Sequence, residues 1–434
     1  MSKKALYVVV LGLLSASLLL AANKDVTIDI SKFDSRKINI AVAPFSELGD
    51  LGEENLGTQV AAIIKNDLRL SGYFTIADRV DEQELQSSSL DYNELKDQGV
   101  DAVVKGTIIK KDNQLLLECY LYDTTSKVRV AGVRYKAIKS ILRKSIHDFS
   151  DEIVFRYTGE KGIAHTRICF VGDTKGQREI YLVDYDGYGL TALTKENALV
   201  LLPKWTPDGQ RIIYTSYKDN NPDLYIIKDN GTGRKMLSGF QGLNSMARFS
   251  RDGKSLVIVL SKDGNPELYL MTPAGEMIRR LTNNKRIDAA PSWSPSNRDL
   301  VFISDRTGVP QMFITDIDGA NVRRLVYSNT YTDSPEWSPT GERIAYVTRM
   351  AKGEFNIFTT DVSGNYQQQL TKGTKRNENP SWSPDGRFLV FVSTRNGKSQ
   401  LFVMNNDGSN QRPLFPGELD DQFKGEIYTP CWSP

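Results

Sequence analysis

Few residues of this chain have the types and spacing that catalysis requires. Among 434 residues there are two His and three Cys. His147 falls in a segment with helical periodicity and His165 in a joining segment, and neither has a nucleophile or a partner base nearby in the sequence. The sequence has no Gly-x-Ser-x-Gly elbow, no phosphate-binding P-loop and no His-Glu-x-x-His motif. We therefore expect no catalytic residues and no enzymatic activity.

Metal and cofactor motifs are also missing from the sequence. Residues 184–187 and 316–319 read Asp-x-Asp-Gly, as parts of calcium loops do, but both lack the later ligands and the closing Glu. Each falls where a strand-to-strand turn is expected, and Asp-Gly is typical turn chemistry. We expect no metal site and no cofactor.

The first 22 residues have the order of a secretory signal peptide. Two lysines precede an apolar stretch, Ala21 and Ala22 offer small residues for cleavage, and the chain then becomes polar. An uncleaved anchor is the alternative, but a helix from Ala5 to Ala22 is about 27 Å long against a bilayer core of about 30 Å. The sequence thus predicts export through a cleaved signal peptide, with a mature chain that is peripheral to membranes.

A repeat organises the second part of the chain. Aromatic residues stand at 205, 249, 293, 337, 382 and 432, and five of them are the only tryptophans of the protein. Most are followed by Ser-Pro-Asp-Gly or a close variant, which is typical of a hairpin corner. Each unit of about 44 residues contains four short strand patterns, the period and content of a β-propeller blade.

The two ends of the repeat complement each other. The last copy stops after Cys431-Trp432-Ser433-Pro434, and the first unit begins at Arg167 without a Trp-Ser-Pro before it. We therefore predict six blades over 161–434, closed by the C-terminal strand.

Closure of the ring would bring two cysteines onto neighbouring strands. A two-residue register would place Cys169 opposite Cys431, where they could form a disulfide. The three-residue corner of the other blades would offset them instead, leaving buried free thiols. Both alternatives stay open at this point.

Residues 23–160 lack the repeat and predict a small α/β domain with a mixed sheet. Strands are expected at 39–45, 74–77, 102–109, 115–122 and 128–135, with helices at 57–71, 93–98 and 141–157. The net charge of +2 argues against broad nucleic-acid binding, which needs a basic surface.

The strand order places one set of variable residues together. The aromatic strand is innermost in each blade, so the residues three to five positions before each aromatic line one mouth of the channel. These residues vary between units while the corner repeats, which suits a binding surface on a shared scaffold, although solvated loops would look the same. The candidate mouth residues are Leu201, Leu202, Asn244, Ser245, Asp288, Ala289, Asp333, Ser334, Glu378, Asn379, Tyr428 and Thr429.

The order of segments, their lengths and the terminal Trp432-Ser433-Pro434 resemble the TolB family, the periplasmic propeller proteins of the Tol-Pal system. Residues 25–30 and the strand Ile40-Ala41-Val42-Ala43-Pro44-Phe45 fit this resemblance at the start of the mature chain. It implies a monomeric, non-enzymatic adaptor that supports outer-membrane integrity and cell division and is exploited by bacteriocins.

The resemblance also implies two partners. Family members bind the peptidoglycan-associated lipoprotein Pal at the propeller mouth, through segments that match Leu243 to Met246 and Asp288 to Ala290 here. Leu243 and Ala289 stand where the family often has His and Thr. The mature N-terminal segment contacts TolA, and other outer-membrane proteins are further candidates. The TolA segment would comprise Asn23, Lys24, Asp25, Val26, Thr27, Ile28, Asp29 and Ile30, where a short extended strand suits β-addition. The competing hypothesis is a hydrolase or a small-ligand-binding protein that uses the channel.

Overall fold

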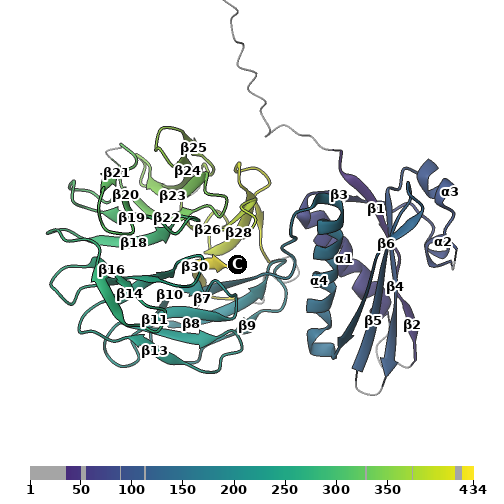
Figure 1. Cartoon of the computed structure of the whole chain (residues 1–434), viewed down its shortest axis with the longest axis horizontal. Coiled ribbons are helices and arrows are strands. Elements are labelled where there is room, and N and C mark those ends of the chain that lie inside the picture. The colour runs from purple at the N-terminus through teal and green to yellow at the C-terminus, as the bar shows by residue number, and fades with distance from the viewer. Residues whose placement is uncertain are drawn as a thin grey trace, which may run out of the picture. The chain divides into compact units, whose positions relative to one another are not determined.

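The computed structural model describes residues 36–49, 55–87, 89–111, 114–327, 330–373, 375–415 and 423–434. The predicted signal peptide and the predicted TolA-binding segment 23–30 lie outside these residues. Residues 38–434 form one compact unit, which contains an α/β part followed by a propeller (Figure 1). None of the described helices is long and apolar enough to cross a membrane.

The α/β part is built on a mixed sheet in the order β3-β1-β4-β5-β6, with β2 paired to β4. Strand β1 runs parallel to β3 and to β4, whereas β4, β5 and β6 form an antiparallel meander. The strands are β1 (Ile38–Val42), β2 (Ser46–Leu48), β3 (Phe74–Ile76), β4 (Ala102–Lys111), β5 (Gln114–Asp123) and β6 (Val128–Ala137). The mixed sheet expected from the sequence is confirmed, and β2 is an addition to it.

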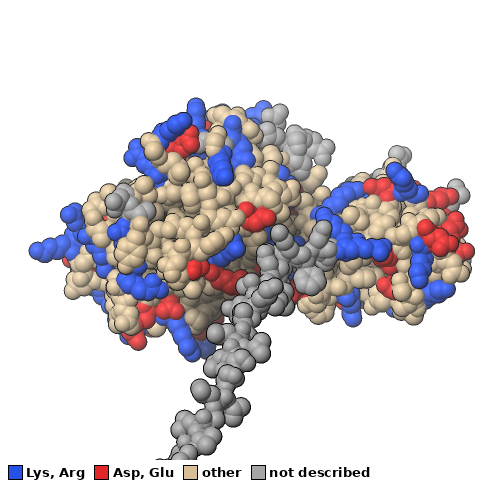
Figure 2. All heavy atoms as spheres, turned by 90° about the horizontal axis from the view of Figure 1, so that it is seen from above, with Lys and Arg blue, Asp and Glu red and all other residues tan. Residues whose placement is uncertain are grey.

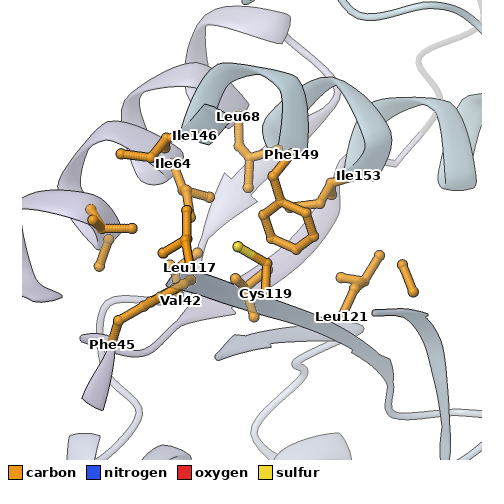
Figure 3. Close-up of a cluster of buried hydrophobic side chains, with 14 of the residues drawn as sticks. Val42, Phe45, Ile64, Leu68, Leu117, Cys119, Leu121, Ile146, Phe149 and Ile153 are labelled. Atoms are coloured by element: carbon orange, nitrogen blue, oxygen red, sulfur yellow. The ribbon is translucent and has the colours of Figure 1, made fainter. Parts of the chain in front are cut away.

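Two helices cover one face of this sheet. Helices α1 (Leu56–Ser71) and α4 (Lys139–Thr158) bury apolar side chains against β1 and β5, as Figure 3 shows around Phe149 and Cys119. Both helices end at a glycine with positive φ, Gly72 at 79° and Gly159 at 75°, where a Cβ would be strained. Two short helices, α2 (Glu82–Gln86) and α3 (Tyr92–Asp97), belong to a second, smaller apolar cluster.

The propeller consists of six four-stranded antiparallel sheets. In sequence order, the five continuous blades are β10 (Val200–Trp205), β11 (Arg211–Ser216), β12 (Asp223–Lys228) and β13 (Lys235–Ser238); β14 (Asn244–Phe249), β15 (Leu256–Leu260), β16 (Glu267–Met271) and β17 (Met277–Arg280); β18 (Asp288–Trp293), β19 (Asp299–Ser304), β20 (Gln311–Asp316) and β21 (Arg323–Arg324); β22 (Thr332–Trp337), β23 (Arg343–Arg349), β24 (Phe355–Asp361) and β25 (Gln367–Gln369); and β26 (Asn377–Trp382), β27 (Phe388–Ser393), β28 (Gln400–Asn405) and β29 (Arg412–Pro413).

The sixth blade joins the two ends of the propeller, as the repeat predicts. Strand β30 (Glu426–Trp432) pairs with β7 (Arg167–Thr174), which is followed by β8 (Gln177–Asp184) and β9 (Thr191–Ala192). The six-bladed ring closed by the C-terminal strand is therefore confirmed. Closure gives β7 a paired inner neighbour in place of a free sheet edge.

Three of the five tryptophans link neighbouring blades. The indole nitrogens of Trp205, Trp293 and Trp382 donate hydrogen bonds to backbone carbonyls of the preceding blade, at 3.2, 3.0 and 3.0 Å. Each accepting residue, Cys431, Arg248 or Glu336, directly precedes the aromatic residue of that blade. These three tryptophans are thus both core residues and polar links around the ring, whereas Trp337 donates to the Gly341 carbonyl of its own corner and Trp432 to the Thr166 hydroxyl.

Candidate functional site at the propeller mouth

The innermost strand of every blade carries the same irregularity near its start. In all six, the register against the second strand shifts between the residues four and one positions before the aromatic. This is a β-bulge, which bends the strand and re-aims its side chains. It repeats at the end of the ring where the innermost strands begin, which we call the mouth.

One residue of each bulge has a left-handed backbone although it is not glycine. We call these six residues the bulge ring, and each lies three positions before its aromatic. Their φ angles are 57° for Leu202, 52° for Met246, 49° for Ala290, 50° for Ser334, 53° for Asn379 and 45° for Thr429. Such residues cost of the order of 1 kcal/mol each and concentrate at functional sites. The bulge ring lines a cavity of about 150 Å³ in the channel.

The residues four positions before each aromatic form the outer ring of the mouth. Five are partly exposed and one, Ser245, is buried with its hydroxyl bonded to Thr215 at 2.9 Å. The outer ring comprises Leu201, Ser245, Ala289, Asp333, Glu378 and Tyr428. The chemistry of the outer ring differs between blades. Leu201 and Ala289 are apolar, Asp333 and Glu378 place acids in two consecutive blades, and Tyr428 is aromatic.

The polar members of the outer ring are held in place by their neighbours. Asp333 accepts a hydrogen bond from Tyr331 at 2.7 Å, and Glu378 forms an ion pair with Arg376 at 3.3 Å. Burial and the nearby charge of Asp333 raise the pKa of Glu378, although Arg376 opposes this. The Arg178 guanidinium lies over the Tyr428 ring, 4.5 Å from its centroid. The two acidic side chains of the mouth are therefore held in position by neighbouring side chains.

Two predicted mouth residues five positions before an aromatic are not at the surface. Asn244 and Asp288 are both 0% exposed. Asn244 bonds Ser238 and the backbone of Phe240, and Asp288 pairs with Arg306 at 2.8 Å. Ser245, in the outer ring, is buried as well. These three predicted mouth residues are thus buried in the structure, where Asn244 bonds Ser238, Ser245 bonds Thr215 and Asp288 pairs with Arg306.

The other predicted residues stay close to the mouth. Leu243 is partly buried just before β14, and its amide donates to Ser261 at 2.8 Å.

The bulge was not predicted from the sequence. Its available signal is the proline that follows the bulge residue in five of six units, at Pro203, Pro291, Pro335, Pro380 and Pro430. A residue before proline is steered away from the right-handed helical region.

The two histidines lie away from this mouth. His147 is 2% exposed, and its Nδ1 lies 2.8 Å from Asp67 Oδ2. His165 is exposed and bonds Asp151. Among the described residues, Asp67, His147 and Asp186 come close enough to hold a metal ion. Arg143 already supplies a positive charge to Asp186 there.

The two Asp-x-Asp-Gly segments are turns. In 316–319, Asp316 Oδ1 accepts the amide hydrogens of Asp318 and Ala320, at 3.1 and 2.8 Å. In 184–187, the Gly187 amide bonds the Asp184 carbonyl at 2.9 Å. In 316–319 an aspartate side chain thus bonds the turn itself, whereas Asp184 and Asp186 form ion pairs with Arg143.

The ring closure places two cysteines opposite each other. In the antiparallel pairing of β30 with β7, Cys431 is the direct partner of Cys169. The offset expected from a three-residue corner is therefore not what the structure has. Both residues are buried free thiols in the structure, and Cys119 is a third one in the α/β core.

Charge is mixed on one face of the described residues. Figure 2 shows Lys and Arg interspersed with Asp and Glu on the face that it displays. The face displayed lacks the single-sign footprint that a nucleic-acid interface uses.

The fold and the mouth together define a six-bladed β-propeller preceded by a small α/β domain. The model of the TolB beta propeller domain matches residues 154–434, and the model of the TolB amino-terminal domain matches residues 26–130. The chain belongs to the TolB family.

Named relatives match about half of the chain. The Tol-Pal system protein TolB of Geobacter sulfurreducens is 36% identical over 193 residues, which cover 44% of this chain and 45% of that protein. That of Dechloromonas aromatica is 29% identical over 210 residues, 48% of each chain. The chain spans about half the length of the curated relatives it matches.

A solved structure matches much more of the chain. The crystal structure of TolB from Acinetobacter baumannii superposes with a TM-score of 0.77 at 26% identity, covering 92% of this chain and 97% of that one. A chain of the nidogen/laminin complex matches with a TM-score of 0.51 at 11% identity, and shares the fold alone.

Proposed function

We propose that this chain is a periplasmic, non-enzymatic adaptor of the Tol-Pal system. In this role the propeller mouth binds the lipoprotein Pal, and residues 23–30 of the exported chain bind TolA. The adaptor would support outer-membrane integrity and cell division. Membership of the TolB family and relatives named as Tol-Pal system proteins support the proposal.

One observation carries the mouth assignment. All six blades hold a strained, left-handed residue at the same place, while the side chains at and beside that place differ. A purely structural corner would favour glycine where φ is positive. Keeping Leu, Met, Ala, Ser, Asn and Thr there presents a set of specific side chains at the channel entrance.

The character of the mouth indicates what the partner presents. Asp333 and Glu378 are acidic, Tyr428 is aromatic, and Leu201 and Leu202 are apolar and partly exposed. A partner with basic groups around an apolar segment fits such a surface. Buried aromatic and apolar contacts would supply most of the binding energy, and the acids would set orientation and association rate.

The test is capture of purified Pal by the exported chain. Tyr428→Ala and Glu378→Lys are expected to weaken capture by about tenfold or more, because they remove an anchor and reverse a charge. Glu342→Lys is the matched control, since Glu342 is exposed in the corner that follows an aromatic strand, at the other end of the ring. Unchanged capture by the two mouth variants would refute the mouth assignment.

The alternative function is a hydrolase or a small-ligand-binding protein. His147 and Asp67 form a histidine–carboxylate pair, but Tyr185 donates to the same carboxylate at 2.8 Å. The pair lies buried, and among the described residues it has no Ser or Cys nucleophile bonded to it. We therefore favour the adaptor, and binding of Pal with no turnover of ester or peptide substrates is the expected result.

A further inference from the structure

A second cavity of about 220 Å³ lies in the channel beyond the bulge ring. All five tryptophans and Phe249 line it, together with prolines of the repeated corners. The residues directly before the six aromatics also line it, and we call them the inner ring. The inner ring comprises Lys204, Arg248, Ser292, Glu336, Ser381 and Cys431.

Positive charge in this cavity exceeds negative charge. Among its described lining residues, Lys204, Arg248 and Arg251 are cationic and Glu336 is acidic. Arg248 binds Glu336 at 2.6 Å, and Lys204 lies 3.9 Å from the same carboxylate. One carboxylate is thus shared by two cations, and Arg251 has no ion pair with any described residue. Burial raises the pKa of Glu336, but the charges of Arg248, Lys204 and Arg251 outweigh this and lower it.

Arg251 is an exception within the repeat. The other five units have a proline two positions after the aromatic, at 207, 295, 339, 384 and 434, and this unit has arginine. Arg251 is exposed and lines this cavity as well as a neighbouring one, and its backbone amide donates to Asn297 at 2.7 Å. The corner of this blade therefore keeps its turn, and the guanidinium of Arg251 takes the place of the proline ring found in the other five units.

Two hydroxyl groups add hydrogen-bond donors. Ser292 accepts the amide hydrogen of Trp337 at 2.9 Å, and Ser381 accepts that of Trp432 at 3.1 Å. Because each hydroxyl oxygen acts as an acceptor in these bonds, its proton is directed elsewhere. Within the described residues neither hydroxyl donates to a protein acceptor, so both protons are available to a ligand in the cavity.

We propose that this cavity binds a small oxyanion of at least two negative charges, of the phosphate class. Among the lining side chains, three cations against one carboxylate leave a net positive charge, which favours an anion with more than one negative charge. Guanidinium groups bind phosphate oxygens in a bidentate manner, and serine hydroxyls complete the coordination. A cavity of about 220 Å³ has room for a small anion. This site shares Lys204, Arg248 and Glu336 with the cavity at the bulge ring, whereas Arg251, Ser292 and Ser381 do not line that cavity.

The experiment titrates the full exported chain with inorganic phosphate at constant ionic strength, with sodium chloride as the compensating salt. Tryptophan fluorescence reports directly, because all five tryptophans line the cavity. The purification tag belongs at the N-terminus, since Pro434 also lines the cavity. A saturable change with phosphate or sulfate is the expected result.

Three variants make the assignment specific. Arg251→Gln is expected to weaken phosphate binding by about tenfold, and Glu336→Gln to strengthen it several-fold by removing the competing carboxylate. Arg298→Gln is the control, because Arg298 is exposed in the corner of the next blade, outside the cavity. Arg251→Pro, which restores the residue of the other units, is expected to behave like Arg251→Gln.

Three outcomes would overturn the proposal. They are the absence of a saturable response to phosphate and sulfate, an equal response in wild type and Arg251→Gln, or a response confined to citrate, which would indicate a carboxylate ligand. Capture of Pal is measured in parallel. A failed anion titration with intact Pal capture, or the reverse, separates this inference from the proposed function.

Discussion

At the mouth of the propeller, one residue step separates a surface acid from a buried one. Asp333 lies four positions before its aromatic and is partly exposed, whereas Asp288 lies five positions before its own and is fully buried. Asp288 binds Arg306 and the Asn284 amide group, at 2.8 and 2.7 Å, and so fixes the loops around it. Burial raises the pKa of Asp288, while Ser304 and Arg306 oppose that shift.

We predict that Asp288→Ala lowers the free energy of unfolding of the propeller by about 2–3 kcal/mol. The variant leaves a partly buried guanidinium without its carboxylate. Asp333→Ala, in the exposed position of the next blade, is expected to cost about 1 kcal/mol. Urea unfolding measures both. Equal losses would mean that Asp288 is not a structural residue.

His147 provides a pH-dependent contribution to stability. Burial lowers its pKa, but the hydrogen bond and charge of Asp67 together with the charge of Asp186 outweigh burial and the opposing charge of Arg143, so the pKa is raised. Asp67 lies on α1, and Asp186 and Tyr185 lie after β8. The folded chain therefore binds the His147 proton more tightly than the unfolded chain does.

The raised pKa of His147 determines how the free energy of unfolding changes with pH. The stabilisation is fully present below the unfolded pKa of about 6.5 and is lost as the pH rises through the higher folded pKa. We expect the free energy of unfolding to fall over this window, and His147→Gln to flatten that part of the pH profile. An unchanged profile in the variant would assign the dependence to another group.

At the scale of elements, the backbone strain of the bulge can be tested in β18, where two adjacent alanines differ in backbone conformation. Ala289 has an extended backbone, and Ala290 has φ of 49°. Replacement of Ala289 by glycine is expected to cost about 1 kcal/mol, because glycine loses more backbone freedom on folding. At Ala290 the relief of left-handed strain offsets most of that cost, so Ala290→Gly is expected to be about 1 kcal/mol more stable than Ala289→Gly. Equal losses would show that the bulge is unstrained.

The elements were more predictable than the details of the site. Helix α1 follows the apolar spacing of Val60, Ile64 and Leu68 and ends before Gly72, so its bounds could be read closely. The predicted first strand ran to Phe45, but β1 ends at Val42, since Pro44 lacks an amide hydrogen for the sheet. The six blades followed from the spacing of the aromatics.

The burial of individual mouth residues could not be predicted in the same way. Spacing before the aromatic located the mouth, but a bulge changes which side chains face the channel beyond it, and its position depends on pairing with the second strand. The burial of Asn244, Ser245 and Asp288 depends on contacts with side chains from other segments, which the spacing does not reveal. The charge imbalance of the inner ring also appears only when residues from different blades are brought together.

At the scale of the whole molecule, closure depends on one strand. Strand β30 supplies the innermost strand of the blade that begins with β7, so residues at opposite ends of the propeller sequence share one sheet. Ser433 strengthens this closure, because its hydroxyl accepts the Arg167 amide hydrogen at 3.0 Å. Opening of the ring would therefore have to begin by losing these contacts or the blade-to-blade packing beside them.

The cysteine pair is placed where it could lock that closure. Cys169 and Cys431 are direct cross-strand partners, and both are buried. We propose that they form a disulfide in the periplasm, the oxidising compartment in which the proposed function places the chain. The closed loop is long, so the chain-entropy model gives a stabilisation of the order of 5 kcal/mol.

Thiol titration of the denatured, non-reduced protein tests this latch. We expect one reactive thiol, that of Cys119, and three after reduction. Reduction should also lower the melting temperature of the wild type but leave that of Cys169→Ser unchanged, because the variant has no bond to lose. Cys119→Ser is the control and should keep the redox dependence. Three thiols in the non-reduced protein would contradict the latch and leave β30 held by hydrogen bonds and packing alone.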